Sequence, residues 1–388
     1  MSRRCFEGAV TAPLALYIHW PFCVSKCPYC DFNSHVREGV DVEAWRAALV
    51  ADMAHEAART GGHILSSIFF GGGTPSLMPP ALVAALIETA ERHWGLADDI
   101  EITLEANPNS VEVARFADLA RAGVNRVSLG IQSFESDALR FLGRAHDAGE
   151  AHTALDVAQA HFARVNFDLI YALPCQSVRQ WQSQLEAALS RATAHLSLYQ
   201  LTIEPGTRFE TLVRQGDFVP LDADHAADLY ELTQALTAQA GIPAYEVSNH
   251  ARPDQQSRHN LAYWRYQDYV GIGPGAHGRL RGHATQRHKK PENWLAAVAR
   301  NGHGMESETL LEPQDQAREA LMMGLRLAEG IDIPALAARL DLDEAAMLDR
   351  AAVAQLSNHG LLHDDGLRLA VTPAGMLLLD AILPQIVL

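Results

Sequence analysis

The sequence predicts an α/β protein: a partial (β/α)6 barrel followed by a C-terminal winged-helix-like helical domain. The first observation is that apolar, β-rich runs recur along the first half of the chain, each followed by a segment of helical length. Strands that alternate with helices in this way form a mainly parallel sheet. The second is the number of such units, which suits a partial barrel better than a closed eight-stranded one.

Six segments carry the strand pattern, and they set the order of the barrel. They are Leu16–Trp20, Ser67–Phe70, Glu101–Glu105, Arg126–Ile131, Val165–Ile170 and Leu196–Thr202. Between the first two, Trp45, Leu49 and Met53 recur at helical spacing and predict an amphipathic helix. Reactive groups in such folds lie at the carboxyl ends of the strands, so functional side chains are expected there.

Composition excludes several classes of protein. The 388 residues carry 47 acidic and 31 basic side chains, a net charge of −16 that argues against broad nucleic-acid binding. Hydrophobic residues make up 48% and charged residues 20%, an ordinary globular balance. No apolar run approaches the ~20 residues of a membrane span, and no signal peptide is evident. We expect a soluble cytoplasmic protein.

The chain divides into four expected parts. Residues 1–14 form an N-terminal extension, 15–290 the barrel with a further segment, 291–312 a polar linker, and 313–388 the C-terminal domain. In that domain, helical patterns precede a hairpin signal at Asp364-Asp365-Gly366, which indicates a winged-helix-like module. From residue 301 onward there are five arginines, no lysine and fourteen acidic residues, so a lid or partner-docking role is favoured over DNA binding.

Three of the five cysteines are clustered in Cys23-Val-Ser-Lys-Cys27-Pro-Tyr-Cys30. An odd number of closely spaced cysteines is a poor disulfide framework for a large protein. A tetrahedral zinc site would need a fourth ligand, which His19 or His35 could supply. Three thiolates suit a [4Fe-4S] cluster better, because they leave one iron open to an external ligand.

Other chemically informative residues follow the predicted strands. A Gly71-Gly72-Gly73-Thr74-Pro75 loop comes directly after the second strand, where glycines let the backbone approach a ligand closely. Glu105, Gln132 and Asp168 stand at or beside three further strand ends. Any one of them could be a satisfied buried polar group, but together they are expected to line one pocket.

The Cys-x3-Cys-x2-Cys spacing, with Tyr29 before the last cysteine, resembles the radical S-adenosylmethionine (SAM) superfamily. The resemblance implies that Cys23, Cys27 and Cys30 hold a [4Fe-4S] cluster. In that family the amino and carboxylate groups of the methionine moiety of SAM chelate the open iron, and reductive cleavage can then give a 5′-deoxyadenosyl radical. By the same resemblance, the contacts to SAM fall on Tyr17, Tyr29, Gly72, Gly73, Thr74, Glu105, Gln132, Arg144, Asp168 and Thr202.

Within the superfamily, the chain resembles the porphyrin-related branch of oxygen-independent coproporphyrinogen III oxidases and haem chaperones. The oxidases carry a further cysteine two residues after the last cluster cysteine, whereas this chain has Phe32 there. That difference argues against a decarboxylase, and no catalytic residue is assigned. The Cys30-Asp-Phe-Asn-Ser34 form resembles the chaperone group instead.

A second segment points to haem. His259-Asn-Leu-Ala-Tyr-Trp264 resembles the His-Asn-x-x-Tyr-Trp motif of that chaperone group, which makes His259 the candidate haem ligand. A core histidine beside packed aromatic residues is the alternative interpretation. Downstream lies a basic run that could pair with haem propionates but is better explained as a solvated loop. It consists of Arg279, Arg281, Arg287, Lys289 and Lys290.

The resemblance therefore favours a haem chaperone that binds haem, a [4Fe-4S] cluster and SAM. Its expected partners are apo-haemoproteins such as membrane-bound respiratory enzymes, through which it would associate peripherally with a membrane. The alternative is a radical SAM oxidase that decarboxylates coproporphyrinogen III propionates. A nucleic-acid-binding regulator is a third interpretation, which the acidic charge disfavours. Whether the chain forms a homodimer is left open.

Overall fold

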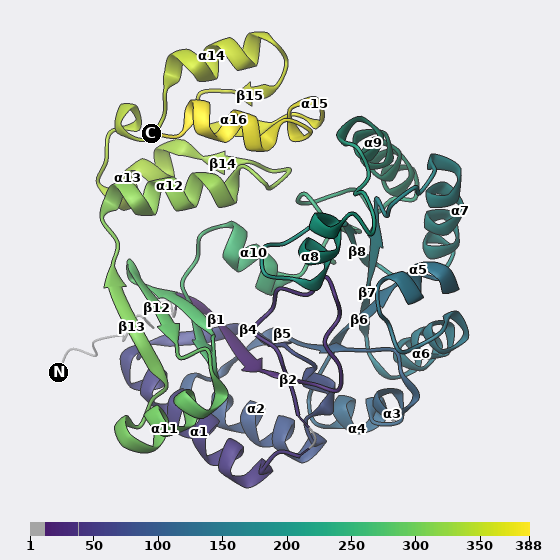
Figure 1. The fold of residues 1–388 in the computed structure, drawn as a ribbon. Helices are drawn as coiled ribbons and strands as arrows, with labels where there is room; N and C mark the ends of the chain where they lie inside the picture. The colour runs from purple at the N-terminus through teal and green to yellow at the C-terminus, as the bar shows by residue number, and fades with distance from the viewer. Residues whose placement is uncertain (1–11, 38) are drawn as a thin grey trace, which may run out of the picture.

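The computed structural model describes residues 12–37 and 39–388. Six parallel strands form the centre of the fold (Figure 1). In spatial order they are β1 (Ala12–Trp20), β4 (His63–Gly72), β5 (Leu96–Ala106), β6 (Arg126–Gln132), β7 (Arg164–Tyr171) and β8 (His195–Gln200). Each predicted strand is present, and the sheet is open at both edges. The predicted partial barrel is thereby confirmed.

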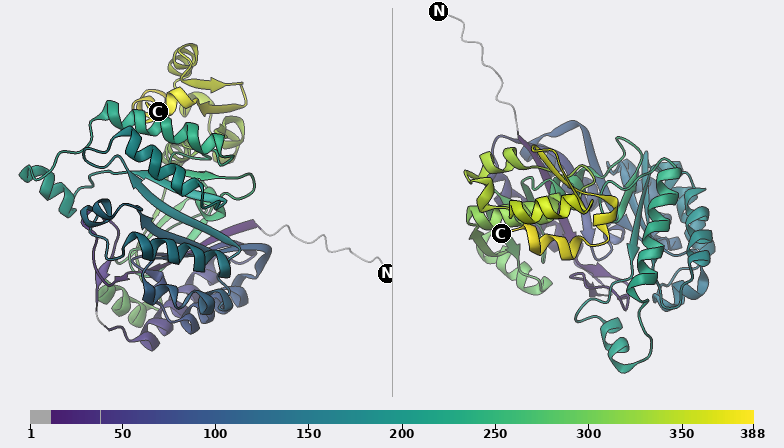
Figure 2. Two further views of the ribbon diagram at one scale, coloured as in Figure 1. Left: turned by 90° about the vertical axis from the view of Figure 1, so that its right-hand side faces the viewer. Right: turned by 90° about the horizontal axis from the view of Figure 1, so that it is seen from above.

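Helices cover the outside of these strands (Figures 1 and 2). They are α1 (Val42–Arg59), α2 (Pro80–Trp94), α3 (Ser110–Val113), α4 (Phe116–Arg121), α5 (Ser136–Phe141), α6 (Ala148–His161), α7 (Val178–Leu189) and α9 (Ala223–Gln239). A further helix, α8 (Arg208–Gln215), projects from the barrel (Figure 2), and its Phe209 packs near Tyr29. The predicted stripe of Trp45, Leu49 and Met53 is buried on α1 and belongs to the main hydrophobic core. Apolar side chains from strands and helices thus share one core, which leaves the strand ends for polar groups.

The sheet continues beyond the barrel on both sides. The added elements are β9 (Asn249–Ala251), α10 (Arg258–Trp264), β10 (Tyr269–Ile272), β11 (His277–Leu280), β12 (His283–Arg287), α11 (Pro291–Asn301) and β13 (Met305–Leu310). β9 runs antiparallel to β8, and β10 lies parallel to β1. The prediction of a linker at residues 291–312 is wrong, because α11 and β13 occupy most of that range. β13 is an edge strand paired with β12, so its largely exposed polar residues gave no strand pattern.

The segment from β10 to β13 is called the extension below. One buried ionic cluster joins this extension to the barrel. The Arg287 side chain is fully buried and contacts the carboxylates of Asp52 and Glu56 on α1. Asp52 also accepts hydrogen bonds from the indole N–H of Trp294 at 3.2 Å and the amide of Gly304 at 3.0 Å. The prediction of a solvated basic loop is therefore wrong for Arg287. It is also wrong for Arg279, which is buried with its guanidinium 3.5 Å from the ring centroid of Tyr266.

The C-terminal domain forms a second hydrophobic core, and Figure 2 shows its helices grouped on one side of the barrel. Its elements are α12 (Pro313–Gly324), β14 (Ile331–Asp332), α13 (Ile333–Leu340), α14 (Arg350–Asn358), β15 (Leu362–Asp364), β16 (Arg368–Val371), α15 (Pro373–Met376) and α16 (Leu379–Ile386). β15 and β16 form the hairpin that the Asp-Asp-Gly turn predicts. The arrangement is the winged-helix-like one expected from the sequence.

At the N-terminus, residues 12–14 belong to β1 rather than to the expected extension, and residues 1–11 lie outside the described residues. None of the helices in the described part of the chain has the length and apolar character needed to cross a membrane.

Candidate functional site

The cysteine loop connects β2 (Phe22–Cys23) to β3 (His35–Val36), a short parallel pair. Asn33 fixes the end of this loop, because its side-chain amide donates to the carbonyls of Pro274 and Lys289, both at 2.9 Å. The carbonyl of Asn33 also contacts Nε2 of His19 on β1 at 2.9 Å. The loop is therefore attached both to the barrel and to the extension that follows it.

The glycine loop at the end of β4 passes close under the cysteine loop. Gly72 has a φ of 115°, and a Cβ there would lie 2.5 Å from the ring of His19. A Cβ on Gly73 would lie 2.7 Å from the carbonyl oxygen of Phe22. Only glycine fits this approach without a shift of its neighbours. The next residue, Thr74, donates its hydroxyl to the Cys23 sulfur at 3.4 Å.

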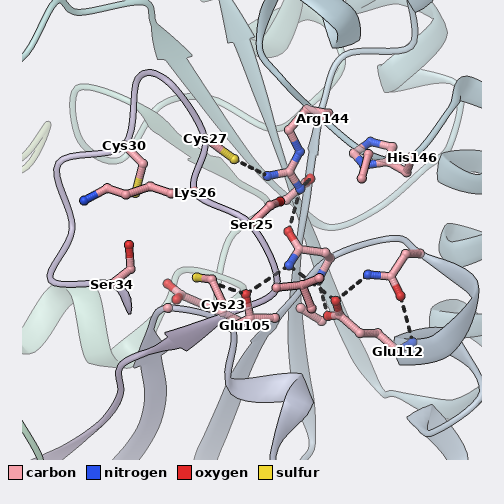
Figure 3. Close-up of a pocket in the computed structure, with 18 of the residues that line it drawn as sticks. Cys23, Ser25, Lys26, Cys27, Cys30, Ser34, Glu105, Glu112, Arg144 and His146 are labelled. Carbon is pink, nitrogen blue, oxygen red and sulfur yellow. Dashed lines mark hydrogen bonds between the residues drawn. The ribbon is translucent and has the colours of Figure 1, made fainter. Parts of the chain in front are cut away.

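The cysteine loop, the glycine loop and the strand ends surround one cavity of about 400 Å³. Figure 3 shows it in close-up, with the cysteine side chains, Arg144 and Glu105 around it. Most of the predicted site residues line this cavity. They are Cys23, Cys27, Tyr29, Cys30, Gly72, Gly73, Thr74, Glu105, Gln132, Arg144 and Asp168. A volume of this size is within the range of small-molecule sites.

Two buried carboxyl groups form the floor of the cavity. Burial, together with the nearby Asp168, raises the pKa of Glu105 to about 8. Burial likewise raises the pKa of Asp168 to about 6, although hydrogen bonds from Asn166, Ser197 and Ser128 oppose that shift. A hydrogen bond from the Gly72 amide to Glu105, at 3.2 Å, ties the glycine loop to this floor. Such groups can accept hydrogen bonds from ligand hydroxyls and attract a cation when ionised.

Arg144 lies across the cavity from the glycine loop. It donates to the Cys27 sulfur at 3.3 Å and to the carbonyl of Gly130 at 2.8 Å. Burial opposes its charge, but Tyr29 and Cys27 raise the pKa of its guanidinium, which keeps it charged. This is a fixed cation beside the cysteines, suited to a ligand carboxylate.

Gln132 is held in an unusual backbone conformation at the end of β6. Its φ is 68°, and the pairing of β6 with β7 shifts register just before it. Left-handed conformations of non-glycine residues carry strain that recurs at functional sites. Here the irregularity ends the strand at a residue that lines the cavity.

Sequence reasoning missed several residues that line the cavity, and Asn107 and Ser34 are the two whose contacts bear most on the site. The amide of Asn107 donates to the Thr74 hydroxyl at 3.2 Å, and its carbonyl oxygen accepts from Arg144, so it bridges two predicted residues. Its position two residues after Glu105, at the same strand end, was the available signal. Ser34 lies in the cysteine loop and also lines the cavity.

The residues present fit an iron–sulfur cluster. The Ser34 hydroxyl is buried and, among the described residues, has no hydrogen-bond partner, although it faces the thiols of Cys23 and Cys30. A buried hydroxyl without a partner is uncommon and indicates a missing acceptor. Burial raises the pKa of both thiols, so thiolates there need a compensating positive charge such as metal. Together these features suit a cluster held by soft sulfur ligands.

Three predicted site residues do not line the cavity. Tyr17 lies on β1 within the barrel and is hydrogen-bonded to Nδ1 of His19 at 3.0 Å. Thr202 is exposed after the end of β8 and contacts the Gln200 carbonyl at 3.3 Å. His259 lies on α10, and its ring contacts Ser67 and Phe69 of β4.

His259 is buried, at 1% exposure, and both of its ring nitrogens are hydrogen-bonded. Nδ1 contacts the Ser67 hydroxyl at 2.9 Å, and Nε2 contacts the Tyr263 hydroxyl at 2.7 Å. The ring also stacks on Phe69 with centroids 4.9 Å apart. Burial, and secondarily Arg126, lowers its pKa to about 3, so the imidazole is neutral. Neutral imidazole is the form that binds iron, but in this conformation neither nitrogen is free.

Comparison with known proteins identifies the family. The model of the Radical SAM superfamily matches residues 17–186, and the model of the HemN C-terminal domain matches residues 311–378. The chain is 41% identical over 326 residues to Heme chaperone HemW of Escherichia coli (strain K12), covering 82% of this chain and 83% of the relative. The chain belongs to the HemW family of radical SAM proteins.

The HemW family extends beyond that one relative. Heme chaperone HemW of Haemophilus influenzae is 37% identical over 382 residues, covering 96% of this chain and 97% of the relative. The mitochondrial radical S-adenosyl methionine domain-containing protein 1 of Bos taurus is 42% identical over 326 residues, covering 82% and 74%. The solved structure of coproporphyrinogen III oxidase (HemN) from Escherichia coli has the same fold, with a TM-score of 0.81 at 24% identity over 97% and 91% of the two chains.

Membership of the radical SAM superfamily implies a [4Fe-4S] cluster and SAM. The predicted fold and the predicted family are both confirmed. The cavity that gathers the cysteines, the glycine loop and the strand-end groups is the part of the chain that fits those two cofactors.

Proposed function

We propose that this protein is a haem chaperone that binds haem, a [4Fe-4S] cluster and SAM, and delivers haem to apo-haemoproteins. The observation that carries the proposal is its identity of about 40% to relatives named Heme chaperone HemW. The convergence of Cys23, Cys27, Cys30 and the strand-end groups on one cavity supports the cofactor part.

The cluster would be held by Cys23, Cys27 and Cys30, which would leave one iron without a cysteine ligand. In this superfamily the cluster supplies an electron to bound SAM. The chain's own residues bind and orient the ligand. Arg144 offers a fixed positive charge to a carboxylate beside Cys27.

The remaining contacts to SAM would come from the glycine loop and the floor of the cavity. Gly72 and Gly73 line the cavity, and their lack of side chains would let a ligand approach the backbone there, although their amides already donate to Glu105 and to the Trp20 carbonyl. Glu105 and Asp168 can accept hydrogen bonds from ribose hydroxyls, and their ionised forms favour a positively charged sulfonium. Tyr17 and Thr202, which lie outside the cavity, would contribute only indirectly or after a local rearrangement.

The haem would be ligated by His259, which must first leave its buried position. Release of the ring breaks the hydrogen bonds to Ser67 and Tyr263. Each buried bond contributes roughly 1 kcal/mol, and the stacking of the ring on Phe69 is lost as well, so haem binding would have to supply at least this free energy. Acceptor haemoproteins such as respiratory enzymes would then draw the chaperone from the cytoplasm to a membrane surface.

A pair of variants tests the role of His259 in haem binding. We expect His259→Ala to weaken haem binding at least about tenfold in an anaerobic titration followed by absorbance. Ser67→Ala leaves the imidazole in place but removes the contact to Nδ1, so haem binding should be retained or strengthened.

Equal weakening in both variants would show that His259 acts only as a structural contact. If the unaltered protein binds haem saturably and neither variant changes that binding, a residue other than His259 ligates the haem. The chaperone proposal would then still stand. If the unaltered protein does not bind haem, the chaperone proposal itself fails.

The alternative is an oxidase, because the fold is that of HemN. Phe32, rather than a cysteine, lies at the edge of the cavity and is 60% exposed. The chain thus lacks a thiol at the position where the oxidases carry their additional cysteine, which favours the chaperone.

A further inference from the structure

A second cavity, of about 260 Å³, lies at the opposite ends of the barrel strands from the cysteine loop. The first residues of three neighbouring strands line it: Arg126 of β6, Arg164 of β7 and His195 of β8. The residues assigned above to SAM stand at the other ends of the same strands, so this cavity is separate from the cofactor site. None of the proposed roles uses it.

The lining of this cavity is rich in hydrogen-bond donors. It comprises Arg126, Gln159, Phe162, Ala163, Arg164, Val165, Ala192, Thr193, Ala194, His195 and Gln255. Within the described part of the chain, no carboxylate side chain lines it. That composition is unexpected in a chain with a net charge of −16, because acidic groups are otherwise abundant.

Arg126 is a buried cation with incomplete pairing. Its side chain is 3% exposed, and its hydrogen bond to the Thr103 hydroxyl is long, at 3.4 Å. Its nearest carboxylate oxygen, on Glu101, is 4.0 Å from Nε. Removing a charge from water costs several kcal/mol unless it is paired and hydrogen-bonded. The guanidinium therefore has unused capacity for an acceptor within the cavity.

Glu101 cannot neutralise Arg126 fully, because it is shared. The same carboxylate oxygen accepts from Nη1 of Arg164 at 2.7 Å. Its other oxygen contacts the Ser257 hydroxyl and the His259 amide, both at 3.3 Å. One carboxylate thus faces two guanidinium groups and the start of α10. Nη2 of Arg164 also donates to the Gln256 carbonyl at 2.9 Å, so Arg126 is the less completely paired of the two arginines, although the charge of Asp168 also acts on it.

His195 does not supply the missing partner. Its Nδ1 contacts the Asn166 side chain at 2.7 Å, and its Nε2 contacts the Tyr245 hydroxyl at 3.0 Å. Burial lowers its pKa well below the ordinary value, so it is neutral and contributes neither charge nor a free donor. The positive potential of the cavity comes from the two arginines alone.

We propose that this cavity binds a small oxyanion, either phosphate or the carboxylate of a small organic acid, on Arg126 and Arg164. The planar guanidinium group matches both chemistries, since two parallel N–H donors meet two oxygens. Thr193 and Gln255 add neutral donors along the wall. Glu101 contacts both Arg164 of this site and the backbone amide of His259. The site is therefore adjacent to the segment that carries His259.

Isothermal titration with inorganic phosphate, and separately with succinate, tests the proposal on the full chain. We expect saturable binding of at least one of them, weakened about tenfold or more in Arg126→Gln, because the variant loses charged hydrogen-bond donors to the anion. Arg265→Gln is the matched control, because Arg265 is partly exposed and pairs with Glu329 away from this cavity. Its binding should equal that of the unaltered protein.

The relative affinities of the two probes distinguish phosphate from carboxylate as the source. If Arg126→Gln does not fold, Thr193→Val removes one donor without touching the ion pairs, and it should weaken binding measurably. Ligand should also slow amide hydrogen exchange at residues 192–195 in the unaltered protein. The proposal is overturned if neither anion binds, or if binding is unchanged in the variants.

Discussion

At the scale of single residues, Ser34 gives the sharpest prediction about the cluster. Its buried hydroxyl faces Cys23 and Cys30 without a partner among the described residues. Hydrogen bonds to cluster sulfurs stabilise the reduced, more negative state and raise the reduction potential. Ser34→Ala should therefore lower the cluster potential by roughly 40 mV, the equivalent of ~1 kcal/mol for one electron.

Redox titration of the reconstituted protein, followed by electron paramagnetic resonance, measures that shift. Ser34→Thr is the control because it keeps the hydroxyl and should keep the potential close to that of the unaltered protein. An unchanged potential in Ser34→Ala would mean that the hydroxyl does not contact the cluster.

The raised pKa of Glu105 predicts that the stability of the cofactor-free protein depends on pH. Burial raises its pKa from 4.5 to about 8, so the folded protein binds this proton more tightly than the unfolded chain. The free energy of unfolding should therefore decrease as pH rises through that interval. The interval from about pH 7 to about pH 8 is the most informative, because ordinary histidines titrate below it. In that interval, Glu105→Gln should abolish most of the decrease in the free energy of unfolding. Urea unfolding at a series of pH values measures it, and an identical slope in the variant would contradict the assignment.

Residue identities in the site were largely predictable because the chemistry is concentrated in short motifs. Cysteine spacing, the glycine loop and polar groups at strand ends are local patterns, and the structure gathers them around one cavity. The surroundings of His259 were not predictable, since Ser67 lies 192 residues away in the chain. Only the fold brings that hydroxyl to the imidazole.

At the scale of elements, Asp52 should control the attachment of the extension to the barrel. Its buried carboxylate on α1 contacts Arg287, Trp294 and Gly304. Asp52→Ala leaves the guanidinium with fewer partners and should reduce the free energy of unfolding by about 3–5 kcal/mol. Glu43→Ala, on the exposed face of the same helix, should change it by no more than about 0.5 kcal/mol. Equal effects of the two variants in denaturant unfolding would be inconsistent with this role.

The extension also shows where sequence patterns mislead about elements. The barrel strands are largely buried and rich in apolar residues, so they are visible in the sequence although each carries some polar side chains. β13 is a mostly exposed edge strand, so its sequence Met-Glu-Ser-Glu-Thr-Leu looks like part of a linker. Arg287 looks solvated in sequence because its partners Asp52 and Glu56 come from a helix more than two hundred residues earlier.

At the scale of the whole molecule, the cluster should be dispensable for folding. Cys27 lies in a loop outside the hydrophobic cores, and its replacement removes a ligand without creating a core cavity. Cys27→Ala should lose the iron, the sulfide and the visible absorbance of the cluster while far-ultraviolet circular dichroism is retained. Cys175→Ala, at an exposed cysteine outside the cavity, should keep all of them. Full iron and sulfide content in Cys27→Ala would refute the ligand assignment.

The two domains meet through hydrogen bonds, an ion pair between Arg265 and Glu329, and packing of α10 against α12. A β-bridge joins Glu246 to Leu327, and Arg339 donates to the carbonyl of Tyr266 at 3.2 Å. Tyr266 lies two residues after the haem motif and packs into the C-terminal core. The C-terminal domain is thus coupled by contact to the segment that carries His259.

The measurement that tests the central claim most directly is anaerobic haem titration of the cluster-reconstituted protein, beside coproporphyrinogen III turnover with SAM and a reductant. We predict stoichiometric haem binding, transfer of that haem to an added apo-haemoprotein, and no decarboxylated product. Formation of the decarboxylated product without saturable haem binding would contradict the chaperone account and make the protein an oxidase.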